Sequence, residues 1–185
     1  MENKKYTFKQ IANYFIKKSF ENKTPISKSR LHKLMYYTKG FYYVFENEEL
    51  FENSFISSKN GPKLKDLSLI LKKYENLITE NDFLTEKEIK NPFILKFLDF
   101  IFEKLNKFDD KKLEELSLED EPIKITEISL KINEEQISKY FREIYLNNDS
   151  LKGNLQIPEE EIILMFNYKT LIKYEKAMKV LAQWN

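Results

Sequence analysis

The 185-residue sequence contains no cysteine, one histidine and three glycines. Without cysteine the chain has no disulfide, no thiol nucleophile and no thiolate zinc site, which favours a reducing, cytoplasmic setting. The single histidine, His32, cannot build a His-rich metal centre, so we expect no bound metal. Three scattered glycines exclude glycine-rich phosphate loops, and no GxSxG motif is present. We therefore predict a protein that is not an enzyme and uses no cofactor.

Long apolar runs are also missing. No run exceeds five residues, whereas a membrane-spanning helix needs roughly 18. The first ten residues, MENKKYTFKQ, lack the apolar stretch of a secretion signal. Hydrophobic residues nevertheless make up 42% of the chain, with 15 Phe and 11 Tyr, which is enough material for a buried core. These features predict a globular cytoplasmic protein with no membrane contact.

The net charge of +1 conceals two regions of opposite sign. Residues 1–73 hold 15 basic and 7 acidic side chains, and residues 74–185 hold 16 and 23. The simpler interpretation is two well-solvated faces, and the alternative is that the separation orients a charged partner.

Apolar residues recur at helical spacing in most of the chain, and helix-start signals precede them. Thr7 and Gln10 have the spacing of a capping box, and Ser27 precedes an apolar and aromatic stripe that runs to Phe45. We expect this second helix to be central, because aromatic residues lie nearly all round it. Further start signals are the capping-box pairs Thr85/Glu88 and Asn133/Gln136, then Asn91–Pro92, Asp109, and Pro158 for a terminal helix.

Two segments depart from the helical pattern. ENSFISSKNGP (52–62) is typical of an extended edge segment or loop, and the alternation of Ile128, Leu130 and Ile132 predicts a short strand. The polar stretch NNDSLKGN (147–154) is the best candidate for a boundary. We predict a mainly α fold: a compact helical domain over residues 1–146 with one or two short minor strands, and a C-terminal helical extension over residues 147–185.

Gly61 directly precedes Pro62, although glycine is rare in this chain. Proline disfavours the α region for the residue before it, and glycine tolerates unusual backbone angles there. We expect a rigid corner that leads into a helix over Lys63–Leu77, with Pro62 as the first helical residue. The corner is either purely structural or also shapes a partner pocket with Tyr36, Tyr37 or Glu121.

Basic residues gather near the first turn between helices, with tyrosines close by. Two helices joined by a short basic turn loosely resemble a DNA-binding unit. Against this, the region has only one arginine, the side chain best suited to reading bases, and the chain as a whole is not basic. Nucleic-acid contact is therefore the alternative, with the candidate residues Lys17, Lys18, Lys28, Arg30 and Lys33.

Four sequence pieces occur in a characteristic order: LHKLMYYTKG (31–40), Leu50–Phe51, SSKNGP (57–62) and LEELSLEDEPI (113–123). Together they resemble the Panacea domain family, which includes SocA-type antitoxins and phage-associated proteins, over about residues 7–146. The chain departs from the family pattern at four places. Ser57–Ser58–Lys59 stands where a tryptophan is common, Lys63 replaces a valine, Ser117–Leu118 replaces a histidine, and Ile123 replaces a second tryptophan.

The resemblance implies an antitoxin: a non-catalytic protein that binds and neutralises a toxin encoded alongside it, and in the SocA case delivers that toxin to a protease. On this basis the candidate partner-binding residues are Tyr36, Tyr37, Lys59, Asn60, Gly61, Pro62, Glu114, Glu115 and Glu121. The alternative is a phage or mobile-element inhibitor of a host defence system such as an RNA-guided CRISPR nuclease, an anti-CRISPR-like protein that contacts protein and RNA through the basic region. A DNA-binding regulator is a third class.

Overall fold

The computed structural model describes residues 5–74, 77–78 and 86–146, and in the C-terminal part residues 155, 157, 160–161 and 163–170. The protein is mainly helical with two antiparallel two-stranded sheets, β1–β4 and β2–β3, which confirms the predicted class. The elements are α1 (Phe8–Glu21), β1 (Ile26–Ser27), α2 (Lys28–Glu46), β2 (Phe55–Ile56), β3 (Lys63–Leu64), α3 (Lys65–Leu71), β4 (Leu77–Ile78), α4 (Pro92–Leu105), α5 (Asp110–Glu119), α6 (Glu121–Lys124) and α7 (Glu134–Leu146).

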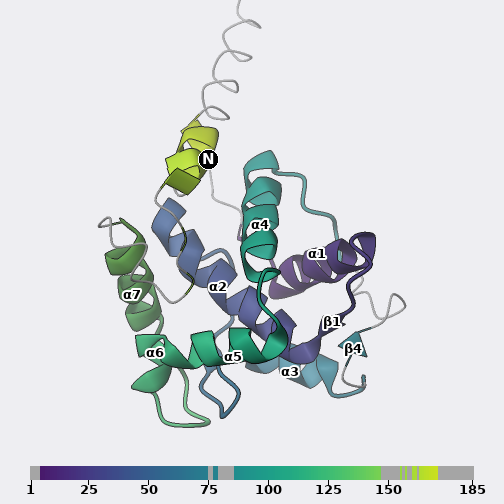
Figure 1. Cartoon of the computed structure of the whole chain (residues 1–185), viewed down its shortest axis with the longest axis vertical. Helices are drawn as coiled ribbons and strands as arrows, with labels where there is room; N and C mark the ends of the chain where they lie inside the picture. Colours follow the sequence, from purple (N-terminus) through teal and green to yellow (C-terminus); the bar gives the residue numbers. More distant parts are fainter. Residues whose placement is uncertain are drawn as a thin grey trace, which may run out of the picture.

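Helix α2 forms the centre of the molecule (Figure 1). Helices α1, α4, α5 and α7 all contact it, and every residue from Leu31 to Phe45 is buried. Aromatic side chains line these contacts and meet mostly edge to face, the arrangement that ring quadrupoles favour. From α7, the Phe141 ring lies 5.3–6.0 Å from the ring centroids of Tyr36, Tyr37 and Phe41. The prediction of a central second helix is confirmed.

Helix α7 is joined to α2 by a buried ion pair and a close approach. Lys39, fully buried, places Nζ 2.9 Å from Glu134 Oε2 and donates to the Asn53 carbonyl at 2.9 Å. At the neighbouring Gly40, a Cβ would overlap with the ring of Phe141. The position of α7 therefore depends on a charge pair and on a missing side chain.

Polar caps begin most helices where the sequence predicts them. Each cap oxygen accepts backbone N–H groups that the first helical turn leaves without a partner. The capping box of Thr7 and Gln10 is reciprocal, and Pro92 lies in the first turn of α4 as expected. The capping side chains are Thr7 for α1, Ser27 for α2, Asn91 for α4, Asp109 for α5 and Asn133 for α7.

Two predicted helix starts are wrong. The helix expected over Lys63–Leu77 is only α3, Lys65–Leu71, because its two ends pair with other strands. Lys63–Leu64 pairs with β2, and Leu77–Ile78 pairs with β1, so Pro62 precedes a strand instead of opening a helix. The capping-box pair Thr85/Glu88 starts no helix either, since residues 86–91 are irregular. Thr85 itself lies outside the described residues.

The strand expected at Ile128, Leu130 and Ile132 is also wrong. It is reduced to a single bridge between Lys131 and Ile56. Ser129 has φ +72°, in the left-handed region, which breaks the alternation of side chains. Ile128 and Leu130 are consequently exposed by 56% and 55%, while Ile132 is buried.

The expected boundary at 147–154 lies outside the described residues, as does Pro158. Residues 160–161 and 163–170 are helical. Phe166 places its ring 4.9 Å from that of Phe45, and Met165 is buried. Glu161 pairs with Lys104 of α4. These described residues therefore pack against α2 and α4.

Candidate functional site

Gly61 and Pro62 form a corner between β2 and β3 that packs against α2 and α5. Gly61 has φ +90°, a backbone angle that glycine adopts at little cost. A Cβ at this position would overlap with Ser117 Oγ of α5 and lie 3.3 Å from Lys33 Cε of α2. The corner therefore needs glycine for two reasons, the backbone angle and the close approach of its neighbours.

Three of the four sequence segments on which the family resemblance was based meet at this corner. Lys33 Nζ donates to the Asn60 carbonyl, and Asn60 Nδ2 donates to Glu114 Oε1 at 3.0 Å. Gly61 touches Ser117, four residues before Glu121. Residues 31–40, 57–62 and 113–123 are thus brought together although they lie far apart in the sequence.

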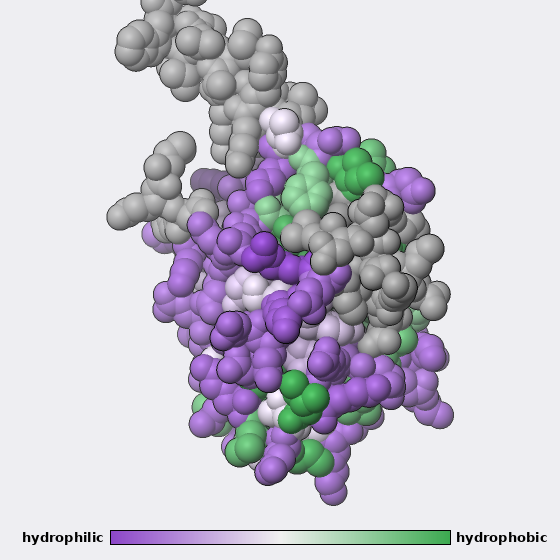
Figure 2. Space-filling model, turned by 90° about the vertical axis from the view of Figure 1, so that its left-hand side faces the viewer, coloured by the Kyte–Doolittle hydropathy of each residue, from purple (hydrophilic) through white to green (hydrophobic). Residues whose placement is uncertain are grey.

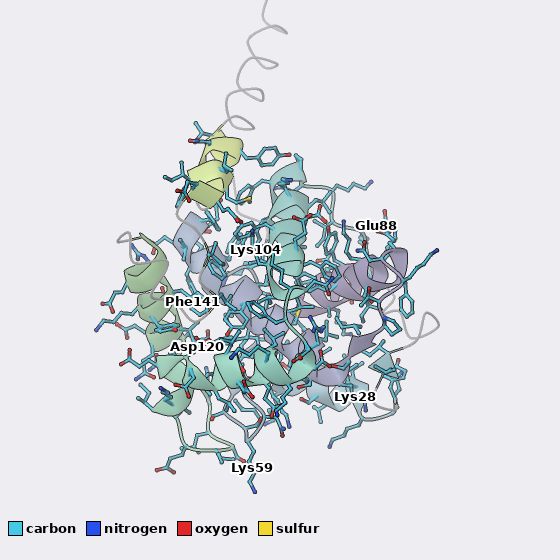
Figure 3. The ribbon with its side chains drawn as sticks, viewed as in Figure 1. Lys28, Lys59, Glu88, Lys104, Asp120 and Phe141 are labelled. Atoms are coloured by element: carbon cyan, nitrogen blue, oxygen red, sulfur yellow. The ribbon has the colours of Figure 1, made fainter. Side chains whose placement is uncertain are left out.

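The candidate partner-binding residues divide by exposure. Tyr36 and Tyr37 are 0% and 1% exposed, so in this conformation they belong to the core and offer no surface to a partner. Gly61 and Pro62 are buried as well. Lys59 points away from the protein at the tip of its loop (Figure 3). The candidates that present surface are Lys59, Asn60, Glu115 and Glu121, together with the half-buried Glu114.

Around the exposed candidates lies a surface that we call the acidic–apolar face, formed by α5, α6 and residues 125–131. Residues 109–135 contain ten acidic and four basic side chains. Within this acidic stretch Ile125, Ile128 and Leu130 are each 55–56% exposed. Figure 2 views the side that carries α6 and α7 and shows apolar residues interrupting the hydrophilic surface near its lower end.

The apolar loop of this face is held in place at both ends. Ile123 and Ile132, which flank it, are buried. Its backbone pairs with the segment after β2, because Ser57 N–H donates to Leu130 O and Ser129 N–H donates to Ser57 O, both at 2.9 Å. The three exposed aliphatic side chains are therefore displayed on an anchored backbone next to the Lys59 loop.

A second feature is a cavity of about 480 Å³ between the start of α2, β3, α3 and α5, which we call the lysine pocket. Its charged lining consists of Lys28, Lys33, Lys63, Lys72, Asp110 and Glu114. Lys33 is 1% exposed and donates to Ser29 Oγ at 2.7 Å. Burial lowers the pKa of Lys33 to about 8, although the charge of Glu114 acts to raise it.

His32 lies in the wall of the lysine pocket as a neutral hydrogen-bonding group. Burial, and then the charges of Lys33 and Lys63, lower the pKa of His32 to about 3. The Leu64 N–H donates to Nδ1 at 3.2 Å, so the proton of the neutral ring is on Nε2, which donates to Ser68 Oγ at 3.2 Å. In this tautomer His32 cannot accept the Ser68 proton, and the pair does not form a serine–histidine nucleophile.

The structure does not bring the candidate nucleic-acid residues together. Lys17 and Lys18 line a separate cavity of about 260 Å³ beside α1 and pair with Glu88 and Asp99, whereas Lys28 and Lys33 line the lysine pocket. Arg30 pairs with Asp110 at 2.6 Å and donates to the carbonyls of Leu105, the last residue of α4, and Phe108 in the turn that follows. Most of these cations are engaged by the protein's own acceptors.

The sequence did not predict the residues that complete the acidic–apolar face and the lysine pocket. Ile128 and Leu130 were expected in a strand, because apolar and polar residues alternate there, and this pattern does not show whether the segment pairs with another strand. Lys63 and Lys72 were expected on one helix, and only the strand pairing of residues 63–64 brings Lys63 beside His32. Among the described residues, no helix is both long and apolar enough to cross a membrane, and no group of three or more acidic or histidine side chains could hold a metal ion.

No known family model matches this chain, and neither a curated protein nor a solved structure shows significant similarity to it.

Proposed function

We propose that the protein acts without catalysis, as a cytoplasmic antitoxin that binds a partner toxin through the acidic–apolar face and holds it inactive. The observation that carries this proposal is the anchored loop that exposes Ile125, Ile128 and Leu130 within an acidic surface. Exposed aliphatic side chains gathered in one loop are typical of an interaction site.

The charge of the face selects the kind of partner. Residues 109–135 have a net charge of −6, so the matching surface is basic and carries an apolar pocket for the isoleucines. Buried apolar contacts supply most of the affinity at such interfaces, and surrounding charges mainly raise the association rate. The resemblance to the Panacea family supports a toxin as the partner. Three of the segments of this chain on which that resemblance is based meet beside this face.

The test is co-expression with the small protein encoded next to this gene, followed by purification and calorimetry. We expect a 1:1 complex and restored growth of cells that express the neighbouring protein. The double variant Ile125→Ser/Ile128→Ser should weaken binding at least about tenfold, because both residues lose their apolar contact. Leu69→Ser is the matched control, since Leu69 is equally exposed, at 56%, but lies on α3.

Charge-reversal variants distinguish an effect on affinity from an effect on the rate of association. Glu115→Lys/Glu121→Lys should slow association and remove much of its salt dependence, whereas Glu21→Lys/Glu103→Lys, a matched reversal on α1 and α4, should have little effect. Equal binding by all variants would exclude the acidic–apolar face. Failure of the neighbouring protein to bind, together with no rescue of growth, would refute the antitoxin function.

A further inference from the structure

The lysine pocket borders the acidic–apolar face, since Asp110 and Glu114 of α5 line it, but its chemical character is different. It is a cavity of about 480 Å³, within the size range of small-molecule sites. Four lysines from α2, β3 and the end of α3 converge on it: Lys28, Lys33, Lys63 and Lys72.

The two carboxylates of the pocket are already engaged. Asp110 pairs with Arg30 at 2.6 Å, and Glu114 accepts a hydrogen bond from Asn60 at 3.0 Å. The side chains of Lys63 and Lys72, in contrast, make no hydrogen bond or ion pair with any residue that the structure describes. The pocket therefore carries an excess of positive charge that its own acids do not balance.

Lys33 adds a buried cation at the back of the same cavity. It is 1% exposed, and its ammonium group has Ser29 Oγ and the Asn60 carbonyl as neutral acceptors. Converging lysines repel one another, so a bound anion with more than one negative charge would stabilise this arrangement.

Neutral donors complete the lining. Ser27 and Ser29 lie at the start of α2, a 19-residue helix whose positive dipole end faces this region. Ser68 accepts from His32, so its hydroxyl proton can donate to a ligand. Hydroxyl groups next to lysines suit a compact oxyanion with several acceptor oxygens.

We propose that the lysine pocket binds a small phosphorylated ligand, such as a nucleotide or a sugar phosphate, with Lys63 and Lys72 contacting its phosphate oxygens. A phosphate group carries more charge and more acceptor oxygens than a carboxylate, and so it can engage several lysines at once. The Asn60 and Ser68 side chains offer hydrogen bonds to the remainder of the ligand.

The test is calorimetric titration of the full chain with pyrophosphate and with ADP at low salt, and with acetate for comparison. We expect binding of the two phosphate compounds and none of acetate. The double variant Lys63→Gln/Lys72→Gln should weaken phosphate binding at least about tenfold, because two charge-assisted contacts are lost. Lys90→Gln/Lys96→Gln is the matched control, with the same change of charge at two exposed positions outside the pocket, and should bind nearly as wild type does.

A second measurement is the uptake of a proton by Lys33 when the ligand binds. Its pKa of about 8 reflects burial first, then Glu114, Lys63 and Asp110, with His32 neutral. An anion would raise this pKa, so at pH 8 binding should take up roughly half a proton. Titrations in buffers of different ionisation enthalpy measure this uptake, and Lys33→Met should abolish it.

Three results would overturn the proposal. One is no binding of pyrophosphate or ADP at millimolar concentration in low salt. Another is equal binding by wild type and Lys63→Gln/Lys72→Gln. The third is lysine-dependent binding of single-stranded RNA without binding of pyrophosphate or ADP, which would assign the pocket to nucleic acid instead.

Discussion

Replacing Gly61 with alanine tests why this chain places one of its few glycines before a proline. At φ +90° an alanine costs about 1–2 kcal/mol of backbone strain. Its Cβ would also overlap with Ser117 Oγ, which donates to the Glu114 carbonyl at 2.9 Å, and displacing that hydroxyl costs a further ~0.5–1.5 kcal/mol. We expect Gly61→Ala to lower the free energy of unfolding by about 1.5–3.5 kcal/mol, or the Tm by about 3–14 °C.

Urea unfolding of four proteins separates the two contributions: wild type, Gly61→Ala, Ser117→Ala and the double variant. Without the Ser117 hydroxyl only the backbone strain remains, so the effect of Gly61→Ala should shrink by about 0.5–1.5 kcal/mol in the Ser117→Ala background. If the free-energy changes of Gly61→Ala and Ser117→Ala simply add in the double variant, Ser117 does not clash with the alanine Cβ. A loss below about 0.5 kcal/mol in the single variant would refute the positive φ itself.

Three further predictions concern the core. Because the pKa of His32 is lowered from 6.5 to about 3, only the unfolded chain binds that proton between these pH values, and stability falls on acidification by up to about 1.4 kcal/mol per pH unit. His32→Gln should lack this part of the slope in urea unfolding from pH 7 to 4.5, and equal slopes would contradict the burial of a neutral ring. Lys39→Met should destabilise by about 3–5 kcal/mol, because it leaves the buried carboxylate oxygens of the half-buried Glu134 without their cation, and Lys39→Met/Glu134→Leu should recover most of this loss. Gly40→Ala should destabilise by about 1–3 kcal/mol in thermal melts despite better helix propensity, and Phe141→Leu should make the alanine more tolerable; an unchanged Tm would place Phe141 elsewhere.

The sequence predicted the features that depend on local chemistry. The caps at Thr7, Ser27 and Asn91, and the burial of the helix after Ser27, follow from side-chain hydrogen bonding and apolar periodicity within a few residues. The class of fold was predictable for the same reason.

The rest depends on contacts between distant segments. Residues 63–64 continue the helical spacing of Leu67 and Leu71, but pairing with β2 makes them a strand. Tyr36 and Tyr37 were expected near a surface, since nothing in their own helix shows that α7, about one hundred residues later, covers them. The lysine pocket likewise needs side chains from α2, β3 and α5, so its members have no common spacing in the sequence.

The position of α2 also affects how the chain emerges during synthesis. The helix is complete at residue 46, yet one of its covering rings, Phe141, is one hundred residues downstream of Phe41. At elongation rates of about 5–20 residues per second that interval takes about 5–20 s, which is long compared with the microseconds in which a helix forms. During this interval a ribosome-bound chain holds a helix rich in tyrosine and phenylalanine that lacks its cover, the kind of segment that chaperones bind. Translation speed between residues 46 and 141 is therefore expected to influence the yield of folded protein.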